Sequence, residues 1–316
     1  MTRSAQWRDL SDLEVALLCR LHYLARGSVE ALGSDISQGQ GLERVLAEKL
    51  AAEPRTAIHE ALLHLDAAGL TCCAGEQWRL TDRGRPLAYN LCELEIQRQS
   101  GVWATIAATL GIHGPFRSML DIGCSGGMSA IPGSEAGLLS ENSRYIGLDV
   151  DQRGLHAGLD LLAQFSGTAP SVTLIAGDAR RLPIADSSVE CVISRATLYY
   201  LKKRPVLAEM VRSLTPGGYL IVTVPTLDYM AGKFLEGVMA LNFRQAVVHA
   251  IAVILGLFAW LGFDVSPPRG CFIGETRRGL ASRMKHVPEM KLLRLAPISL
   301  PMLGKPLLLV ARKGAR

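Results

Sequence analysis

The sequence lacks the cysteine and histidine patterns that hold zinc: it has no CxxC pair and no paired Cys/His spacing of the usual kind. Its seven cysteines are an odd number, and only Cys72 and Cys73 are adjacent. These two could bind a soft metal, but small hydrophobic side chains in a core are the favoured interpretation. The sequence therefore predicts no metal site.

Low-complexity sequence, collagen-like repeats and sustained coiled-coil heptads are also missing, which excludes a disordered or fibrous architecture. Residues 1–14 contain no apolar run of the kind that a secretory leader needs, so a cytoplasmic protein is the expectation. What is present is 316 residues, 49% of them hydrophobic and 20% charged. This length and composition predict two globular domains, or at most three.

The formal charge of +5 is unevenly distributed along the chain. Residues 1–100 contain 11 Lys/Arg and 14 Asp/Glu, residues 101–225 contain 10 of each, and residues 226–316 contain 13 and 5. Attraction to phosphates supplies most non-specific affinity for DNA, so the acidic first part disfavours a nucleic acid partner. The basic last part suits anionic lipid head groups.

Residues 1–100 have the pattern of a mainly helical domain. Apolar residues at helical spacing predict three helices, over 13–24, 42–52 and 55–68. Ser11-Asp12 can cap the first, a turn at 75–76 joins two short extended segments, and another helix begins near Pro86. This order resembles a winged helix, and the run His64–Ala88 carries the resemblance. We expect the domain to form a homodimer contact or to cover a substrate.

Residues 116–225 alternate short apolar strands with helices, which predicts a parallel sheet covered on both faces. Strands are expected at 117–122, 145–150, 172–176, 189–194 and 219–224, with helices at 128–139, 153–164 and 205–214. A helix at 275–286 and strands at 290–295 and 306–312 would complete the domain. The predicted fold is α/β, a doubly wound, mostly parallel sheet of seven strands in residues 101–316, behind the helical domain 1–100.

Four motifs follow these strands in order. The first strand runs into Asp-Ile-Gly-Cys-Ser-Gly-Gly, residues 121–127, where glycine lets the backbone turn tightly and approach a ligand. The second ends at Asp149, whose carboxylate can accept hydrogen bonds from both hydroxyls of a ribose. Gly-Asp-Ala, residues 177–179, offers an acid suited to an exocyclic amine such as that of adenine. Leu-Thr-Pro-Gly-Gly, residues 214–218, precedes the fifth strand.

These motifs, in this order, resemble the class I S-adenosylmethionine-dependent methyltransferases, most closely their quinone-biosynthesis and small-molecule type. The resemblance covers about residues 116–224. It implies S-adenosylmethionine as cofactor and S-adenosylhomocysteine as product. The cofactor-binding residues that it implies are Asp121, Gly123, Ser125, Gly127, Asp149, Asp178, Ala179, Ser194 and Arg195.

Within that family the glycines of the first motif pack against the methionine moiety, and Asp121 lies near its ammonium group. Asp149 binds the ribose, Asp178 with Ala179 binds the adenine, and residues 194–195 border the cofactor and the substrate mouth. Ser125 stands where the family often has glycine. The dinucleotide fingerprint G-x-G-x-x-G is absent, because residues 123–128 read G-C-S-G-G-M, and this disfavours a dehydrogenase.

An insertion interrupts the family pattern after the fifth strand. The pattern needs only a helix there, so residues 227–271 are extra, and such insertions commonly cover the substrate. Residues 246–263 have no formal charge and contain His249, which a satisfied core histidine would explain. The favoured role of this stretch is a cavity wall or a dimer interface. A peripheral membrane contact stays open, since the nearby cations are Arg244, Arg269, Arg277, Arg278, Arg283 and Lys285.

We therefore predict methyl transfer to a lipophilic small molecule, with oxygen as the favoured acceptor atom. Polar candidates near the substrate are Arg195, Thr197, Tyr199, Tyr200, Tyr229 and His249, and the sequence assigns none of them as the catalytic base. One alternative is a membrane-associated methyltransferase of a lipid or quinone. Another is a regulator or scaffold that binds the cofactor without catalysis.

Overall fold

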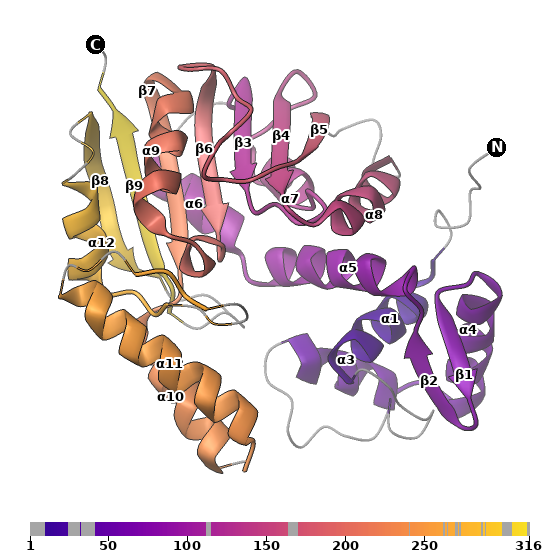
Figure 1. Cartoon of the computed structure of the whole chain (residues 1–316). Helices are drawn as coiled ribbons and strands as arrows, with labels where there is room; N and C mark the ends of the chain where they lie inside the picture. The colour runs from indigo at the N-terminus through magenta and orange to yellow at the C-terminus, as the bar shows by residue number, and fades with distance from the viewer. Residues whose placement is uncertain are drawn as a thin grey trace.

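The structure is a computed structural model. It describes residues 10–24, 32, 42–111, 115–163, 170–239, 241–261, 263, 265–268, 271, 273–285, 287, 289–298 and 305–314. Arg269, one of the cations noted near the insertion, lies outside these residues. A helical N-terminal part, a seven-stranded sheet with helices on both faces, and a long helical hairpin make up the molecule (Figure 1).

The N-terminal part contains helices α1 (Asp12–Leu24), α3 (Leu42–Ala51) and α4 (Arg55–Ala67), then strands β1 (Thr71–Ala74) and β2 (Gln77–Leu80) and helix α5 (Gly84–Gln99). The three predicted helices are confirmed, and β1 and β2 pair antiparallel around the predicted turn. Gly69 ends α4 with a φ of 72°, a conformation that glycine adopts without strain. The assignment of this part as a winged helix stays a prediction.

The start of α1 is held by a reciprocal cap. The Ser11 N–H donates to Glu14 Oε2 at 2.6 Å, and the Glu14 N–H donates to Ser11 Oγ at 3.3 Å. Burial would raise the pKa of Glu14, but hydrogen bonds from His64 and Ser11 together lower it below its ordinary value. His64 lies on α4, so this carboxylate also joins the first helix to the third.

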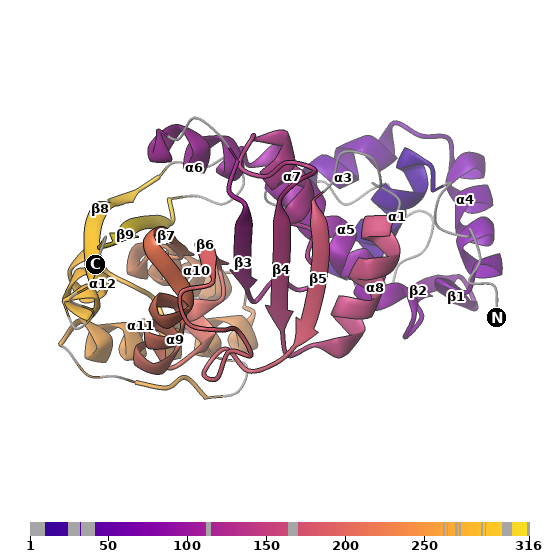
Figure 2. The ribbon, with the colours of Figure 1, turned by 90° about the horizontal axis from the view of Figure 1, so that it is seen from above.

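The sheet has the strand order β5-β4-β3-β6-β7-β9-β8, and this confirms the predicted doubly wound fold (Figure 2). Five parallel strands form its centre: β3 (Ser118–Ile122), β4 (Arg144–Asp149), β5 (Ser171–Ala176), β6 (Val189–Arg195) and β7 (Leu214–Val224). Strands β8 (Met290–Pro297) and β9 (Leu307–Lys313) form an antiparallel edge. The order of the strands reverses between β3 and β6, and ligands of such sheets bind at this switch point.

Two hydrophobic cores cover the faces of the sheet, because successive strand side chains point to opposite sides. Met119 of β3 joins the core shared with α6 (Val102–Leu110), α7 (Ala130–Glu135) and α8 (Gln152–Leu162). Its neighbour Leu120 joins the core shared with α9 (Lys203–Ser213) and α12 (Arg277–Met284). Figure 2 shows α7 and α9 on opposite sides of the sheet.

Two sequence predictions at the sheet are corrected. The helix expected over 128–139 spans only Ala130–Glu135 as α7, because Pro132 and Gly133 fall inside it and Gly137 takes a φ of 73°. The fifth strand was expected over 219–224, but β7 begins at Leu214, which pairs with Val189. The register shifts between Val189 and Cys191, so the Pro-Gly-Gly segment forms an irregularity within the strand.

The insertion consists of two helices where the sequence suggested a single one. Helix α10 (Leu227–Met239) and helix α11 (Phe243–Trp260) pack against each other and project from the sheet domain (Figure 1). Helix α11 begins three residues before the start, and ends three residues before the end, of the uncharged stretch 246–263 that was noted in the sequence. Its start is set by Asn242, whose Oδ1 accepts a hydrogen bond from the Gln245 N–H at 3.1 Å. We refer to the pair as the α10–α11 hairpin.

Candidate active site

The glycine-rich loop after β3 adopts a left-handed backbone at three positions. Gly123 and Gly127 have φ values of 74° and 76°, and Ser125 between them has a φ of 54°. Glycine adopts this conformation readily and serine rarely does, which explains why the related pattern often has glycine at position 125. The Ser125 hydroxyl compensates by donating a hydrogen bond to Asn90 Oδ1 at 3.0 Å.

The same loop also packs too closely for larger residues. A Cβ at Gly158 of α8 would overlap the carbonyl oxygen of Gly126, and a Cβ at Gly126 would overlap the Asn90 side chain. Gly126 therefore lies between two helices, α8 and α5, that meet at the carboxyl end of β3. The absence of a side chain at Gly158 is therefore as necessary for this close packing as the glycines of the motif are. No sequence pattern indicated this role for Gly158.

Asp149 occupies the tip of β4, as predicted, beside the glycine-rich loop. Its Oδ2 accepts a hydrogen bond from the Ser125 N–H at 2.8 Å, and its Oδ1 accepts one from the Asp151 N–H at 3.0 Å. The side chain is half-buried. A carboxylate can accept about four hydrogen bonds, so two acceptor positions remain for a ligand after these backbone contacts.

Asp121, at the end of β3, lies beneath the loop rather than on its surface. It is 2% exposed and accepts a hydrogen bond from the Tyr145 hydroxyl at 2.7 Å. Burial raises its pKa, while nearby Arg195 and the Tyr145 bond act in the opposite direction. A desolvated carboxylate of this kind favours a cation beside it.

The other predicted cofactor residues differ in their surroundings. Asp178 is half-buried and is bound by the guanidinium of Arg180, with Nη2–Oδ2 at 2.6 Å, and this lowers its pKa. Ala179 next to it is buried. Ser194 is fully buried and donates its hydroxyl hydrogen bond to the Ile122 carbonyl at 3.2 Å. Ser194 therefore supports the ends of β3 and β6 from within the sheet.

Helix α5 of the N-terminal part lies beyond the carboxyl ends of β3 and β4 (Figure 1). Asn90 fixes it there: besides accepting from Ser125, it donates from Nδ2 to the Gly154 carbonyl at 2.9 Å. Asn90 is completely buried. One side chain thus ties α5 to the glycine-rich loop and to the start of α8.

A cavity of about 340 Å³ opens beside this loop, at the carboxyl ends of β6 and β7. Its walls come from α5, α6, the strand ends and both helices of the hairpin. Most lining residues are apolar, and the polar ones include Glu93, Arg195, Tyr199, Tyr229 and His249. A cavity that combines apolar walls with convergent polar groups is typical of a small-molecule site.

Arg195 and Glu93 face the cavity from opposite domains. The Arg195 guanidinium lies 5.6 Å from the centre of the Trp103 ring and donates to Ser129 Oγ at 3.3 Å. Among the described residues, its buried Nε has no hydrogen-bond partner. Burial raises the pKa of Glu93, and the charge of Arg195 partly offsets this. Glu93 was not predicted, because an acid within a helix of the N-terminal domain has no sequence signature.

Tyr199 and His249 supply further polar groups to the cavity. The Tyr199 hydroxyl donates to Tyr200 Oη at 3.3 Å, and burial raises the pKa of Tyr199 well above its ordinary value. His249 Nδ1 lies 2.8 Å from the Gln245 carbonyl, which can only accept, so Nδ1 carries the proton. His249 is half-buried in the cavity wall, which corrects its interpretation as a core histidine.

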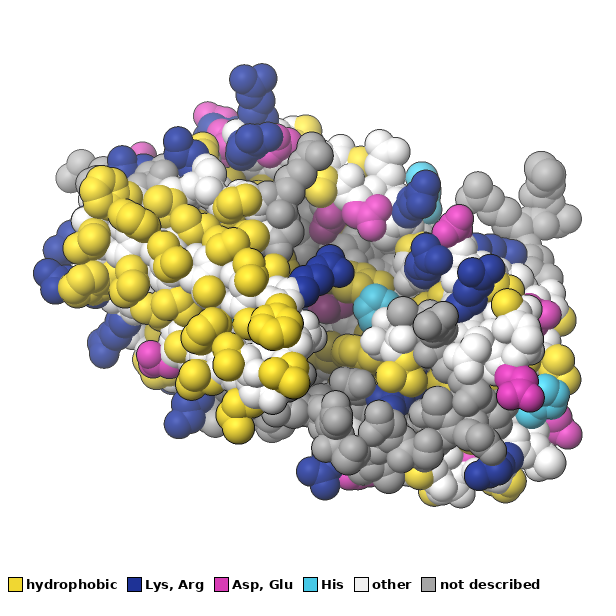
Figure 3. All heavy atoms as spheres, turned by 60° about the horizontal axis from the view of Figure 1, so that its bottom comes forward, with side chains coloured by type: hydrophobic (Ala, Val, Ile, Leu, Met, Phe, Trp, Pro, Cys, Tyr) yellow, Lys and Arg dark blue, Asp and Glu magenta, His cyan; other side chains and the backbone are white. Residues whose placement is uncertain are grey.

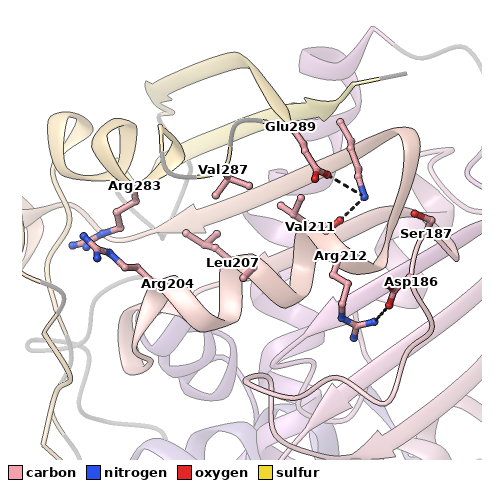
Figure 4. Close-up of a pocket in the computed structure, with 11 residues that line it drawn as sticks. Asp186, Ser187, Arg204, Leu207, Val211, Arg212, Arg283, Val287 and Glu289 are labelled. Atoms are coloured by element: carbon pink, nitrogen blue, oxygen red, sulfur yellow. Dashed lines mark hydrogen bonds and ion pairs between the residues drawn. The ribbon is translucent and has the colours of Figure 1, made fainter. Parts of the chain in front are cut away.

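A second cavity, of about 540 Å³, lies along α9 and α12 (Figure 4). Asp186 and Ser187, which line it, precede β6, so it extends toward the amino end of that strand. Its acids are paired, since Arg212 binds Asp186 at 2.5 Å and Lys313 binds Glu289 at 3.6 Å. Because ligands of doubly wound sheets bind at the carboxyl ends, the cavity at the ends of β6 and β7 is the candidate site. No group of three His, Cys, Asp or Glu side chains in the described ranges is placed to hold a metal ion.

Comparison with known proteins agrees with this geometry. Residues 120–222 match the family model described as a methyltransferase domain. Over 109 residues the chain is 34% identical to a demethylmenaquinone methyltransferase of Renibacterium salmoninarum, covering 34% of this chain and 41% of that protein. Over 80 residues it is 38% identical to phthiotriol/phenolphthiotriol dimycocerosates methyltransferase 1 of Mycobacterium ulcerans, covering 25% and 28%. The chain thus spans less than half the length of these relatives.

A crystal structure of a SAM-dependent methyltransferase from Aquifex aeolicus superposes with a TM-score of 0.49 at 12% identity, covering 74% of this chain and 99% of that one. The strand order, the carboxylates at the switch point and the family match define a methyltransferase domain. Residues 120–222, about a third of the chain, carry this match, and the cofactor that the four sequence motifs indicate is S-adenosylmethionine.

The residues present fit that cofactor, which carries a sulfonium and an ammonium group. The carboxylates of Glu93 and Asp121 lie near Arg195, and that of Asp149 lies near Asp121. Because burial raises the pKa of Glu93 and Asp121, a cationic ligand would stabilise their ionised forms. Asp149 keeps acceptor positions for hydroxyls, and the buried Arg195 Nε can donate to an oxygen.

Proposed function

We propose that the protein transfers the methyl group of S-adenosylmethionine to a hydroxyl of a lipophilic small molecule. The observation that carries the proposal is the cavity at the ends of β6 and β7. Its apolar lining suits a hydrophobic acceptor, and Arg195 borders both the cavity and the switch point where the cofactor-binding residues gather. Two relatives are named for a demethylmenaquinone and a phthiotriol acceptor, both lipophilic, which supports the same class of substrate.

The residues that would hold the cofactor are those of the glycine-rich loop, with Asp149 for the ribose hydroxyls and Asp121 beneath the loop as the buried counter-charge. The bound cofactor supplies an activated methyl group on sulfur. The protein then has to position the acceptor and exclude water. The walls formed by α5 and the α10–α11 hairpin serve both purposes, because they enclose the cavity from two sides.

An oxygen acceptor has to lose its proton, and His249 is the group that we assign to this step. Its Nδ1–H donates to the Gln245 carbonyl, which makes Nε2 the nitrogen that accepts a proton in the neutral ring. Helix α11 holds the ring in the cavity wall, opposite the strand ends. Arg195 is suited to attract an acidic hydroxyl, since its guanidinium is fixed by Trp103 and Ser129.

A label-transfer assay tests the proposal. The full-length protein is incubated with S-adenosylmethionine labelled on the methyl group and with an organic-solvent extract of the producing cells, then partitioned into organic and aqueous phases. We expect protein-dependent label in the organic phase, on an oxygen atom by mass spectrometry, and none with Asp149→Ala. Label confined to the aqueous phase would contradict a lipophilic acceptor, and label on carbon or nitrogen would contradict O-methylation.

A further inference from the structure

The outer surface of the α10–α11 hairpin is apolar to an unusual degree. Within the described residues, α11 is the helix that is long and apolar enough, by length and composition, to cross a membrane. Only 22% of it is buried, whereas the core helix of a soluble protein is mostly buried. The side of α11 that carries His249 lines the cavity, and the opposite side is exposed. Large contiguous apolar patches on a monomer usually mark an interaction site.

Six exposed apolar residues of α11 and its C-terminal cap fall on one side of the helix, whereas the exposed Arg244 and Trp260 flank that side. At 100° per residue, positions 243, 247, 254, 257, 258 and 261 lie within an arc of about 100°. These six side chains, which we call the apolar stripe, are between 47% and 74% exposed: Phe243, Val247, Ile254, Leu257, Phe258 and Leu261. The sequence of α11 carries a formal charge only at Arg244, which lies outside the arc. The stripe is therefore continuous and uncharged along the helix.

The end of the hairpin extends this surface. Val238 and Met239 at the end of α10, and Leu241 in the turn, are exposed, with Met239 at 86% and Leu241 at 75%. Figure 3 shows hydrophobic side chains covering this face of the molecule, with Lys and Arg side chains at its edges. A hollow separates it from the N-terminal part in the same view, where the cavity is lined by residues of α5 and of the hairpin.

Positive charge surrounds the stripe. Arg277, Arg278 and Lys285 on and after α12, which packs against α11, are exposed. The Arg278 guanidinium lies 5.8 Å from the centre of the Trp260 ring, at the end of the stripe. On α10, Glu236 is paired with Lys233 at 2.7 Å. Cations at the edge of an apolar surface favour anionic lipid head groups over a neutral surface.

We propose that the apolar stripe and the end of the hairpin insert into the surface of an anionic lipid bilayer. Lying in the bilayer surface fits this geometry better than spanning does. Helix α10 has 13 residues, about 20 Å of helix, which is too short for a hydrocarbon core of about 30 Å. The chain then returns to β8 of the same sheet. A helix with an uncharged face and basic flanks is the usual form of a surface-bound segment.

The proposed bilayer contact is inferred from the hairpin surface alone. Its role in delivering the acceptor rests on the proposed function. The hairpin forms both the bilayer contact and one wall of the cavity, through Tyr229, Met230 and His249. A lipophilic acceptor would then pass from the bilayer to the cavity without crossing water. The same surface could instead bury itself against a second copy of the chain, and the experiment below separates these outcomes.

Co-sedimentation of the full-length protein with lipid vesicles tests the proposal. One set of vesicles is phosphatidylcholine, and the other is phosphatidylcholine with about one third phosphatidylglycerol. We expect binding to the anionic vesicles that weakens with salt. Replacing two stripe residues, Phe243→Ser with Leu257→Ser, should lower the partition coefficient by at least about tenfold, since both side chains leave an apolar environment. The control is Leu63→Ser on α4, whose side chain is 50% exposed, close to the 47% of Leu257, and which should leave binding unchanged.

Two results would overturn the proposal. In the first, the wild-type protein stays in the supernatant with both kinds of vesicle. In the second, analytical ultracentrifugation without lipid shows a dimer that the Phe243→Ser, Leu257→Ser variant converts to monomers, which makes a second copy the occupant. Calorimetry with S-adenosylhomocysteine on the same samples keeps the two proposals apart. Vesicle binding without binding of S-adenosylhomocysteine would contradict the proposed function but would still support the bilayer contact.

Discussion

The Ser125 hydroxyl of the glycine-rich loop donates a hydrogen bond to Asn90 Oδ1 of α5, across 3.0 Å. This bond joins the N-terminal part to the loop that bears the cofactor motif. Asn90 donates in turn to the Gly154 carbonyl at 2.9 Å, so both polar ends of a fully buried amide are satisfied. The helix that covers the cavity is thereby fixed by the same residues that shape the cofactor loop.

Replacing this amide should loosen the loop. Asn90→Ala leaves the Gly154 carbonyl and the Ser125 hydroxyl without their partner, which costs about 1–3 kcal/mol of unfolding free energy. Because Ser125 is held in a left-handed backbone conformation, we also expect weaker binding of S-adenosylhomocysteine, by about tenfold. Denaturant unfolding and calorimetry measure the two effects. The exposed Asn142→Ala serves as control, and equal affinity in Asn90→Ala would show that the loop holds its shape alone.

Glu93 should make stability depend on pH. Burial raises its pKa above the ordinary 4.5. The native state then binds the proton more tightly than the unfolded state does, so the carboxylate costs stability as the pH rises through the raised pKa. We expect Glu93→Gln to unfold at a higher temperature than wild type near neutral pH, and the difference to vanish below pH 4.5. Thermal unfolding across this pH range is the measurement, and a less stable Glu93→Gln at pH 7 would contradict it.

The His249 assignment predicts a loss of turnover without a loss of cofactor affinity. General-base catalysis contributes about a hundredfold or more, so His249→Ala should lower kcat by that factor and leave S-adenosylhomocysteine binding unchanged. His156→Ala, an exposed histidine on α8, should behave like wild type. Full turnover in His249→Ala would remove this residue from the mechanism.

The cap of α1 predicts an effect on the N-terminal part alone. Glu14→Ala removes the reciprocal bonds with Ser11, which we expect to cost about 1 kcal/mol at neutral pH. Because its hydrogen bonds lower the pKa of Glu14, this contribution is present above pH 4.5 and is lost as the pH falls below it. Glu14→Gln keeps a capping side chain and should lose less stability. Equal pH dependence in wild type and Glu14→Ala would contradict the role of the carboxylate.

Most of the sheet was predictable, because its strands are short apolar runs separated by helices and each motif follows a strand end. Asp149 and the glycines lie where the motif order indicates, since the carboxyl ends of parallel strands meet at one edge. The start of β7 was missed because Pro216 and Gly217 are typical of turns, yet pairing with Val189 draws Leu214 into the sheet.

The walls of the cavity were less predictable. Asn90 and Glu93 belong to a helix that is far from the motifs in sequence, and only the tertiary packing brings them to the loop. The role of Gly158 was also not predictable, because the sequence of a helix does not show that one of its glycines packs against a backbone carbonyl of another segment. The hairpin was expected as one apolar helix, and hydropathy alone could not separate its cavity side from its outer side.

Binding of S-adenosylhomocysteine by calorimetry tests the central claim most directly, with wild type, Asp149→Ala and a control, Asp186→Ala, in parallel. Asp186 lies before β6, at the opposite end of the sheet, and is paired with Arg212. Asp149→Ala removes the hydrogen bonds offered to the ribose, so we predict wild-type binding that falls by about a hundredfold and is unchanged in the control. Wild-type protein that does not bind, or an Asp149→Ala variant that binds as tightly, would contradict the account.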